Sequence, residues 1–110
     1  MKGLRSSLRE RKRYIGFEVI SEKEIEKKEL IREIFTSATS LYGDKGVSEC
    51  SPWLISFDGK RGILRCSHRM TDEARNVLAS IDRINGSPVG IRVLTISGTI
   101  KGVRKKIKGL

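Results

Sequence analysis

Apolar and polar residues alternate near the start of the chain and then change to a helical repeat. In RYIGFEVI, residues 13–20, every second position is apolar, which is typical of a half-buried strand. Ser21 and Glu24 have the spacing of a capping box, and apolar residues then recur at helical spacing as far as Gly43. The pattern predicts a strand, followed by a long helix that begins after Ser21 and ends at Gly43.

A hairpin is predicted next. In WLISF, residues 53–57, the two aromatic residues and the isoleucine between them fall on one face of a strand. Asp58-Gly59 is a turn pair, and it leads into GILRC, residues 62–66. We expect these two strands to pair, after a glycine-containing loop that Pro52 closes.

The second half of the chain repeats the order of helix and strand. Thr71 can cap a helix whose first turn holds two carboxylates, and Asn85-Gly86 ends that helix. VGIRVLTIS, residues 89–97, is a mostly apolar strand. The C-terminal segment, residues 98–110, has apolar spacings that suit one or two further amphipathic turns.

The predicted order is strand, helix, strand, strand, helix, strand. Two right-handed crossovers in this order predict an α+β fold of the ferredoxin-like plan, which RNA-recognition domains share. It is an α-β sandwich with a four-stranded antiparallel sheet, helices packed on one face, and basic terminal segments. The 110 residues suit one domain, divided into a basic segment (1–13), an α-β core (14–97) and a second basic segment (98–110).

The two faces of the predicted sheet differ in chemistry. Phe17, Trp53 and Phe57 are expected in the core beneath the helices. The opposite face then carries Tyr14, Gly16, Glu18, Arg65 and Arg92. Only Tyr14 in this set can stack a nucleobase as an aromatic side chain does.

The segment RGILRCSH, residues 61–68, partly matches the RNA-reading motif of RNA-recognition domains. The basic residue and the glycine fit, but Ile63, Arg65 and His68 stand where that motif has aromatic residues. Base stacking contributes about 1–3 kcal/mol per base. The sheet is therefore not expected to be the main reader of RNA, and Arg65 is equally well interpreted as pairing with Glu18 or Asp58.

The charge distribution indicates a polyanionic partner. The formal net charge is +10 at pH 7. Residues 1–13 carry six Lys or Arg against one Glu, residues 98–110 carry five against none, and residues 14–97 are balanced. We interpret the ends as contacts for nucleic-acid phosphates. A solubilising tail and an anionic membrane surface remain alternatives.

The sequence lacks the residues that a membrane protein, a secreted protein, a metal-binding protein or an enzyme would need. No apolar run approaches the ~20 residues of a membrane span, and the N-terminus lacks a secretory signal, so we expect a cytoplasmic protein. Cys50 and Cys66 lack the spacing and the histidines of a metal site, and we interpret them as packed thiols, with a disulfide left open. His68, the single histidine, has no nucleophile or base at a known spacing, so no catalytic residues are predicted.

Two functions remain to be weighed against RNA binding. Small ferredoxin-like phosphatases hold phosphate in a glycine-rich loop after the first strand, but residues 20–29 here contain four glutamates and no glycine. A ligand-sensing or regulatory dimerisation module is the runner-up. Its pocket could be lined by Gly43-Asp44-Lys45-Gly46.

Four motifs carry a resemblance to a known family: LRERKRYIGFEV, YGDKG, PWLISFDGKRGILRC and SGTIK. Together they resemble archaeal ribonuclease P protein component 2, whose eukaryotic relatives are the Pop-five proteins. The resemblance extends from Leu8 to Lys106 and departs locally at TISGTI and CSHR.

The resemblance implies a non-catalytic protein subunit of ribonuclease P, which removes the 5′ leader of precursor tRNA. The RNA subunit and its magnesium ions would perform the hydrolysis, and this chain would bind no cofactor or metal itself. The implied partners are the ribonuclease P RNA, precursor tRNA within the complex, and the TIM-barrel ribonuclease P protein component 3. Two such protein pairs could join into a heterotetramer.

The residues expected to contact RNA come from the first motif, from the segment after Ser-Gly-Thr-Ile, and from the third strand. They are Arg9, Arg11, Lys12, Arg13, Lys101, Arg104, Lys105, Lys106 and, more weakly, Arg65. Ser97, Gly98 and Thr99 are expected either to cap the last helical segment or to offer amides to a phosphate. The open sheet face, with Tyr14, Ile63 and Leu94, is expected to be covered by the C-terminal segment or by a protein partner.

Overall fold

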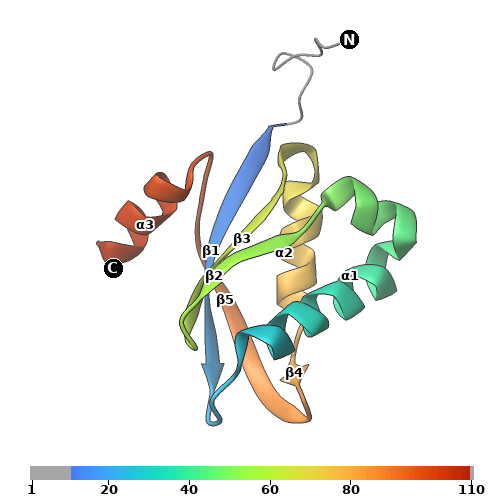
Figure 1. Ribbon diagram of the computed structural model, residues 1–110, viewed down its shortest axis with the longest axis vertical. Helices are drawn as coiled ribbons and strands as arrows, with labels where there is room; N and C mark the ends of the chain where they lie inside the picture. Colours follow the sequence, from blue (N-terminus) through green and yellow to red (C-terminus); the bar gives the residue numbers. More distant parts are fainter. Residues whose placement is uncertain (1–10, 110) are drawn as a thin grey trace.

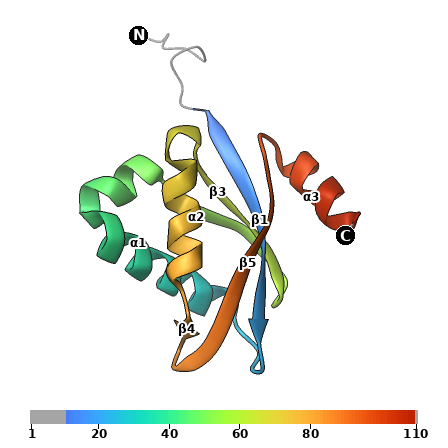
Figure 2. The same ribbon diagram turned by 180° about the vertical axis from the view of Figure 1, so that it is seen from behind.

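The computed structural model describes residues 11–109, which form one antiparallel sheet with helices on both of its faces (Figures 1 and 2). In chain order the elements are β1 (Lys12–Ser21), α1 (Lys27–Cys50), β2 (Trp53–Phe57), β3 (Arg61–Ser67), the single 3-10 turn η2 (His68–Met70), α2 (Thr71–Ser80), β4 (Arg83–Ile84), β5 (Ser87–Ser97) and α3 (Ile100–Lys108). The strand order across the sheet is β2-β3-β1-β5-β4. The α+β prediction is confirmed, but the sheet has five strands and not four.

The core lies between α1, α2 and one face of the sheet. Leu30 and Ile34 of α1 and Leu78 of α2 are at most 2% exposed and belong to the same buried cluster as Phe17 of β1. Burying one such side chain contributes about 1.5–3 kcal/mol. Phe17 also stacks on Phe57 of β2, with ring centroids 6.4 Å apart. The core positions predicted for these two aromatic residues are therefore correct, although Phe57 is only half-buried.

The fifth strand arises from the Asn85-Gly86 pair. Both residues have positive φ, 52° and 81°, as a two-residue type I′ hairpin turn requires. The turn joins β4 to β5, pairing Ile84 with Ser87. The predicted extension of the second helix to this point is wrong, because α2 ends at Ser80.

α1 begins later than predicted. Ser21 pairs with Val89 as the last residue of β1, so its backbone belongs to the sheet and cannot start a helix. The capping box is formed instead by Glu26 and Glu29, and the Glu26 amide donates to Glu29 Oε1 at 3.0 Å. The predicted box at Ser21 and Glu24 is therefore wrong in position.

The helical segment that begins at Lys27 is interrupted at Gly43, where the sequence predicts its end. The φ of 72° and ψ of 177° at Gly43 are non-helical, and a second helical segment then continues to Cys50. A positive φ of this size favours glycine, so the sequence signal marks a real break in helical geometry. The glycine-containing loop that the sequence predicts between Gly43 and Pro52 is instead a second helical segment, which ends at Cys50.

α3 covers the second face of the sheet, on the side opposite to α1 and α2 (Figures 1 and 2). Val103 is fully buried, and Ile107 is half-buried beside it. A Cβ built on Gly16 of β1 would come within 2.8 Å of both side chains. The C-terminal segment is therefore the element that covers this face, and the helices do not all pack on one side.

Two further expectations concern membranes and thiols. Within residues 11–109 no helix is long and apolar enough to cross a membrane. Cys50 and Cys66 are free and buried. Burial raises the pKa of Cys50 to about 12 and that of Cys66 to about 11.

Candidate nucleic-acid interface

The pairing of β1 with its two neighbours brings residues 11–13 and the start of the C-terminal basic segment to one end of the sheet. Lys12 pairs with Ser67 at the end of β3, and Tyr14 pairs with Ser97 at the end of β5, where the chain turns into α3. The His68 amide donates to the Arg11 carbonyl at 3.0 Å. The end of β3 and the start of α3 therefore flank the start of β1 (Figure 1).

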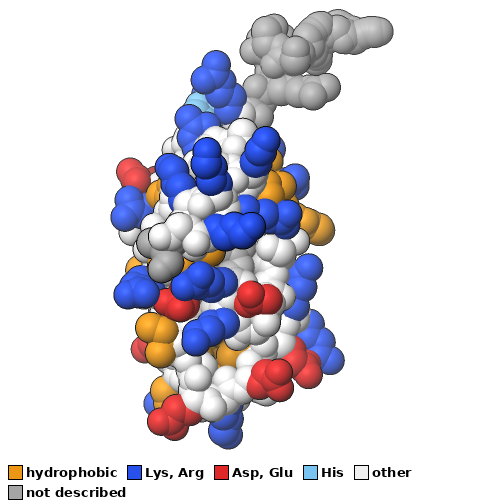
Figure 3. Space-filling view, turned by 90° about the vertical axis from the view of Figure 1, so that its left-hand side faces the viewer, with side chains coloured by type: hydrophobic (Ala, Val, Ile, Leu, Met, Phe, Trp, Pro, Cys, Tyr) orange, Lys and Arg blue, Asp and Glu red, His pale blue; other side chains and the backbone are white. Residues whose placement is uncertain are grey.

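The surface on the α3 side is divided by charge. Figure 3 shows Lys and Arg side chains gathered over its upper half, toward the start of β1, whereas most Asp and Glu side chains lie in the lower half. A positive region of this kind attracts a polyanion and steers its approach. The charged region faces the same side as α3, which identifies the candidate interface.

The cations predicted on β1 lie at this end. Arg11 is exposed, and Lys12 and Arg13 are half-buried. Arg13 Nη1 donates to the Lys12 carbonyl at 3.2 Å and lies 3.6 Å from the Cβ position built on Gly98. Arg13 therefore lies close to Gly98, at the start of the C-terminal basic segment. Arg9 lies outside the described residues.

α3 presents the other group of predicted cations to solvent. The helix is capped by Thr99, whose Oγ1 accepts from the Gly102 amide at 2.9 Å, so the expected capping role of this segment is confirmed. Since the apolar side of α3 is turned to the sheet, the basic residues point outward, and all of them are exposed: Lys101, Arg104, Lys105, Lys106 and Lys108. The final turn holds Lys105, Lys106 and Lys108, where the helix dipole favours positive charge.

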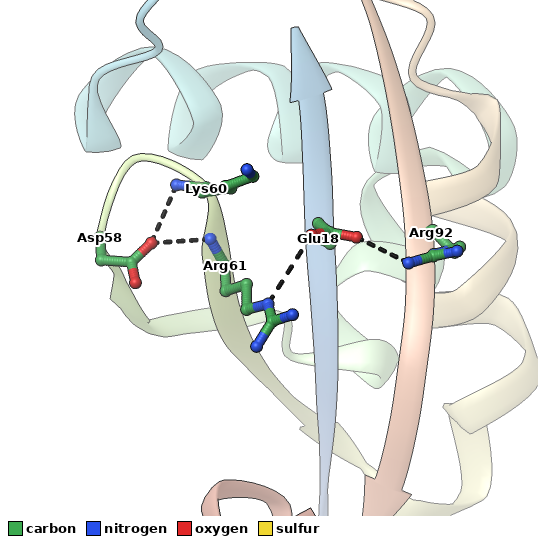
Figure 4. A network of polar contacts seen from close by, with 5 residues as sticks. All are labelled: Glu18, Asp58, Lys60, Arg61 and Arg92. Carbon is green, nitrogen blue, oxygen red and sulfur yellow. Dashed lines mark hydrogen bonds and ion pairs between the residues drawn. The ribbon is translucent and has the colours of Figure 1, made fainter. Parts of the chain in front are cut away.

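Glu18 forms ion pairs with two arginines, which are therefore less free to bind a phosphate than the unpaired cations. Its side chain is 11% exposed and lies between Arg92, whose Nη2 is 2.9 Å from Glu18 Oε1, and Arg61, whose Nε is 3.7 Å from Glu18 Oε2 (Figure 4). Asp58 accepts at Oδ1 from the Arg61 amide at 2.7 Å and from the Lys60 amide at 2.9 Å. These amides, the Arg61 amide above all, hold the pKa of the Asp58 carboxyl below its usual value.

The cations that already have a carboxylate partner can be named. The three ion pairs within residues 11–109 use Arg61, Arg92 and Lys28. None of them uses a cation that was predicted to contact RNA. The interpretation in which Arg65 pairs with Glu18 or Asp58 is wrong, because no ion pair among the described residues joins Arg65 to either carboxylate. Glu18 pairs with Arg61 and Arg92, and Asp58 accepts from the Lys60 and Arg61 amides.

Trp53 does not lie in the core. It lies on the face of the sheet that is opposite to α1 and α2, here called the outer face. β2 pairs with β3 through a bulge between Leu54 and Ser56, and the extra residue, Ile55, shifts the alternation of side chains. Trp53 and Phe57 therefore point to opposite faces although they are four residues apart. Trp53 is 57% exposed. Alternation alone could not reveal this, since it assumes an unbroken register.

The bulge places Trp53 beside a predicted RNA-contact residue. Trp53 pairs with Arg65, and Arg65 pairs with Tyr14 on its other side. All three side chains share the outer face. We call these three residues the outer row. Arg65 is half-buried, and its Nε is buried without a hydrogen-bond partner among the described residues.

The residues suggested for a protein interface are less available than the cations. Ile63 is 3% exposed and lies on the face that α3 covers, where it lines a surface pocket together with Arg104 and Ile107 of α3. Tyr14 and Leu94 are half-buried. Within residues 11–109 no group of three His, Cys, Asp or Glu side chains could hold a metal ion.

Comparison with known proteins identifies the relatives of this chain. A family model described as the Rpp14/Pop5 family matches residues 13–108. Ribonuclease P protein component 2 of Methanosarcina mazei is 41% identical over 106 residues, which cover 96% of this chain and 91% of that protein. The protein of the same name from Pyrococcus horikoshii is 38% identical over 108 residues and covers 96% and 90% of the two chains.

A solved structure has the same fold at much lower identity. A chain in a cryo-EM structure of yeast ribonuclease MRP superposes with a TM-score of 0.67 at 16% identity, over 92% of this chain and 88% of that one. This similarity extends to the arrangement of helices and strands. The sequence similarity to the archaeal proteins is independent of it.

Proposed function

We propose that this chain, which belongs to the Rpp14/Pop5 family, is a protein subunit of ribonuclease P that binds and stabilises the RNA of that enzyme. The observation that carries the proposal is the similarity to Ribonuclease P protein component 2 over 96% of the chain. Ribonuclease P removes the 5′ leader of precursor tRNA. In this proposal the RNA and its magnesium ions perform the hydrolysis, and the protein supplies no catalytic residue and binds no metal.

The order of the long strands supports a ferredoxin-like plan for this subunit. β2-β3-β1-β5 is the order that two crossovers through α1 and α2 produce, with β4 added at one edge. A fold by itself names no function. What matters for the proposal is that this plan places the start of β1 between the ends of β3 and β5.

The cations at that end act by neutralising phosphates. RNA helices repel one another through their backbone charges, and lysine or arginine contacts release condensed counterions and lower that repulsion. We assign this role to the residues that the sequence predicts: Arg9, Arg11, Lys12, Arg13, Arg65, Lys101, Arg104, Lys105 and Lys106. Such contacts position an RNA without reading its sequence.

We further propose two kinds of protein contact. The chain pairs with ribonuclease P protein component 3, and two such pairs associate into a heterotetramer in the cytoplasm. The proposed interface residues are Tyr14, Ile63 and Leu94, of which Tyr14 and Leu94 are partly exposed and Ile63 lines a pocket beside α3.

Reconstitution tests the proposed function. The full chain is combined with ribonuclease P RNA and component 3, and the rate of leader removal is measured as magnesium is lowered. We expect the protein to lower the magnesium concentration needed for half-maximal rate. The proposal is wrong if the chain does not bind the RNA and if its addition leaves the magnesium concentration for half-maximal rate unchanged.

A further inference from the structure

The outer row places an arginine between two aromatic residues across three adjacent strands. Trp53 of β2 is paired with Arg65 of β3, and Arg65 is paired with Tyr14 of β1. Directly opposite residues of antiparallel strands have Cβ atoms about 4.5–5.5 Å apart. The three side chains therefore form one continuous patch on the outer face of the sheet.

Arg65 has a donor without an acceptor. Its Nε is buried and makes no hydrogen bond to any described residue, although Arg side chains normally satisfy their donors. The carboxylate on the same face, Glu18, already holds Arg61 and Arg92. Since Nε is buried, it is not the atom that a ligand contacts; what Arg65 offers a ligand is the positive charge of a half-buried guanidinium that has no carboxylate partner among the described residues.

Trp53 provides an open aromatic surface next to Arg65. It is 57% exposed, and α3 covers the sheet further along, at Gly16 and Ile63. A single exposed apolar residue has no special meaning. Here the tryptophan adjoins a cation, and Lys12 lies two residues before Tyr14 on the same face of β1. Such surroundings favour an anionic ligand over an apolar protein surface.

We propose that the outer row binds one unpaired nucleotide of the RNA, with its base stacked on Trp53 and its phosphate or base edge held by Arg65. This inference rests on the proposed function and adds to it a site that recognises a nucleobase. A nucleotide is the ligand that combines a flat π-surface with acceptor atoms and negative charge. Tyr14 closes the row on the far side of Arg65 and offers a second aromatic surface.

The chain contains one tryptophan, so its fluorescence reports on this site alone. The full chain is titrated with a short single-stranded RNA and, separately, with inorganic polyphosphate, which has charge but no bases. We expect the RNA to quench Trp53 emission to saturation and polyphosphate to leave the emission unchanged while it still competes for binding. Equal quenching by both ligands would overturn the proposal.

Variants at Trp53 test whether RNA affinity depends on base stacking or only on an intact fold. We expect Trp53→Ala to weaken binding of labelled single-stranded RNA on the order of 5- to 100-fold, and Trp53→Phe to retain most of the affinity. Phe35→Ala is the matched control, because Phe35 is an aromatic residue of α1, 37% exposed, away from the outer row. The slope of log affinity against log salt should stay unchanged in Trp53→Ala, since stacking neutralises no phosphate.

The outcomes distinguish the two proposals. If the chain binds ribonuclease P RNA and Trp53→Ala binds it equally well, the nucleotide site is wrong and the proposed function stands. If Trp53→Ala weakens only the binding of component 3, the outer row is a protein contact, and the nucleotide site is again wrong. If the chain binds no RNA at all, the proposed function itself fails.

Discussion

Gly16 of β1 lies directly against Val103 of α3, so closely that a Cβ on Gly16 would come within 2.8 Å of Val103 Cγ1. Ile107 Cδ1 is equally close to that position. The absence of a side chain at residue 16 therefore lets α3 pack on the sheet. The helix that presents most of the exposed basic residues of the interface depends on this one close approach.

Gly16→Val should displace α3 and destabilise the protein by about 1–3 kcal/mol, the usual cost of inserting extra atoms into a packed contact. Urea denaturation would measure the loss. Gly90→Val is the control, because no atom lies within 4 Å of a Cβ built on Gly90 of β5. Equal stability of the two variants would show that α3 does not rest on Gly16.

Removing the carboxylate of Glu18 should leave Arg61 and Arg92 facing each other without a counter-charge. Both arginines are partly solvated, with side chains 37% and 65% exposed, so we expect Glu18→Gln to cost only about 1 kcal/mol. The loss should shrink at high salt, since screening lowers the repulsion. Glu24→Gln, at an exposed position, should change stability by less than about 0.5 kcal/mol.

Native Cys50 and Cys66 should react slowly with thiol reagents. Their pKa values of about 12 and 11 lie above the ordinary value of 9.0, so at pH 8 the native thiolate fractions are about a thousandfold and a hundredfold smaller than in unfolded chain. The rate of colour development with a disulfide reagent, with and without urea, checks this. Fast reaction of the folded protein at pH 8 would contradict the burial of the thiols.

The same shifts predict how stability depends on high pH. The folded state holds these thiols protonated more strongly than the unfolded state does. Their contribution to stability is therefore fully present below pH 9.0 and is lost as pH rises toward 11 and 12. Denaturation midpoints of the parent and of Cys50→Ala across this range would measure it, and the parent should show the steeper decline.

Neutralising the exposed cations of α3 should lower the salt dependence of RNA binding. Each phosphate contact contributes about 0.7–0.9 to the slope of log affinity against log salt, so replacing Lys101, Arg104, Lys105 and Lys106 with Gln should reduce it by up to about 3. The control is the double variant Lys23→Gln, Lys27→Gln. Both lysines are exposed, and they lie among the glutamates between the end of β1 and the first turn of α1. An unchanged slope in the α3 variant would remove these residues from the phosphate contacts.

The element order and the chemistry of the two ends could be predicted from local patterns. Alternation in β1, the helical repeat of α1 and the Thr99 cap of α3 all depend on neighbours within a few residues. The Asn85-Gly86 hairpin was also readable, because this pair is the strongest local signal for a type I′ turn. The apolar repeat that continues through Ile81 and Ile84 nevertheless favours a helix that ends at this pair.

The sequence by itself determined the basic ends, the α+β order and the family motifs, since these are properties of composition and short-range spacing. The tertiary structure decided that residues 11–13 and the start of α3 lie at one end of the sheet, that α3 covers the second face at Gly16, and that Trp53 lies beside Arg65. These outcomes depend on strand register, and one bulged residue, Ile55, reverses the face of the residues beyond it. Register results from the packing of distant segments, so no local pattern specifies it.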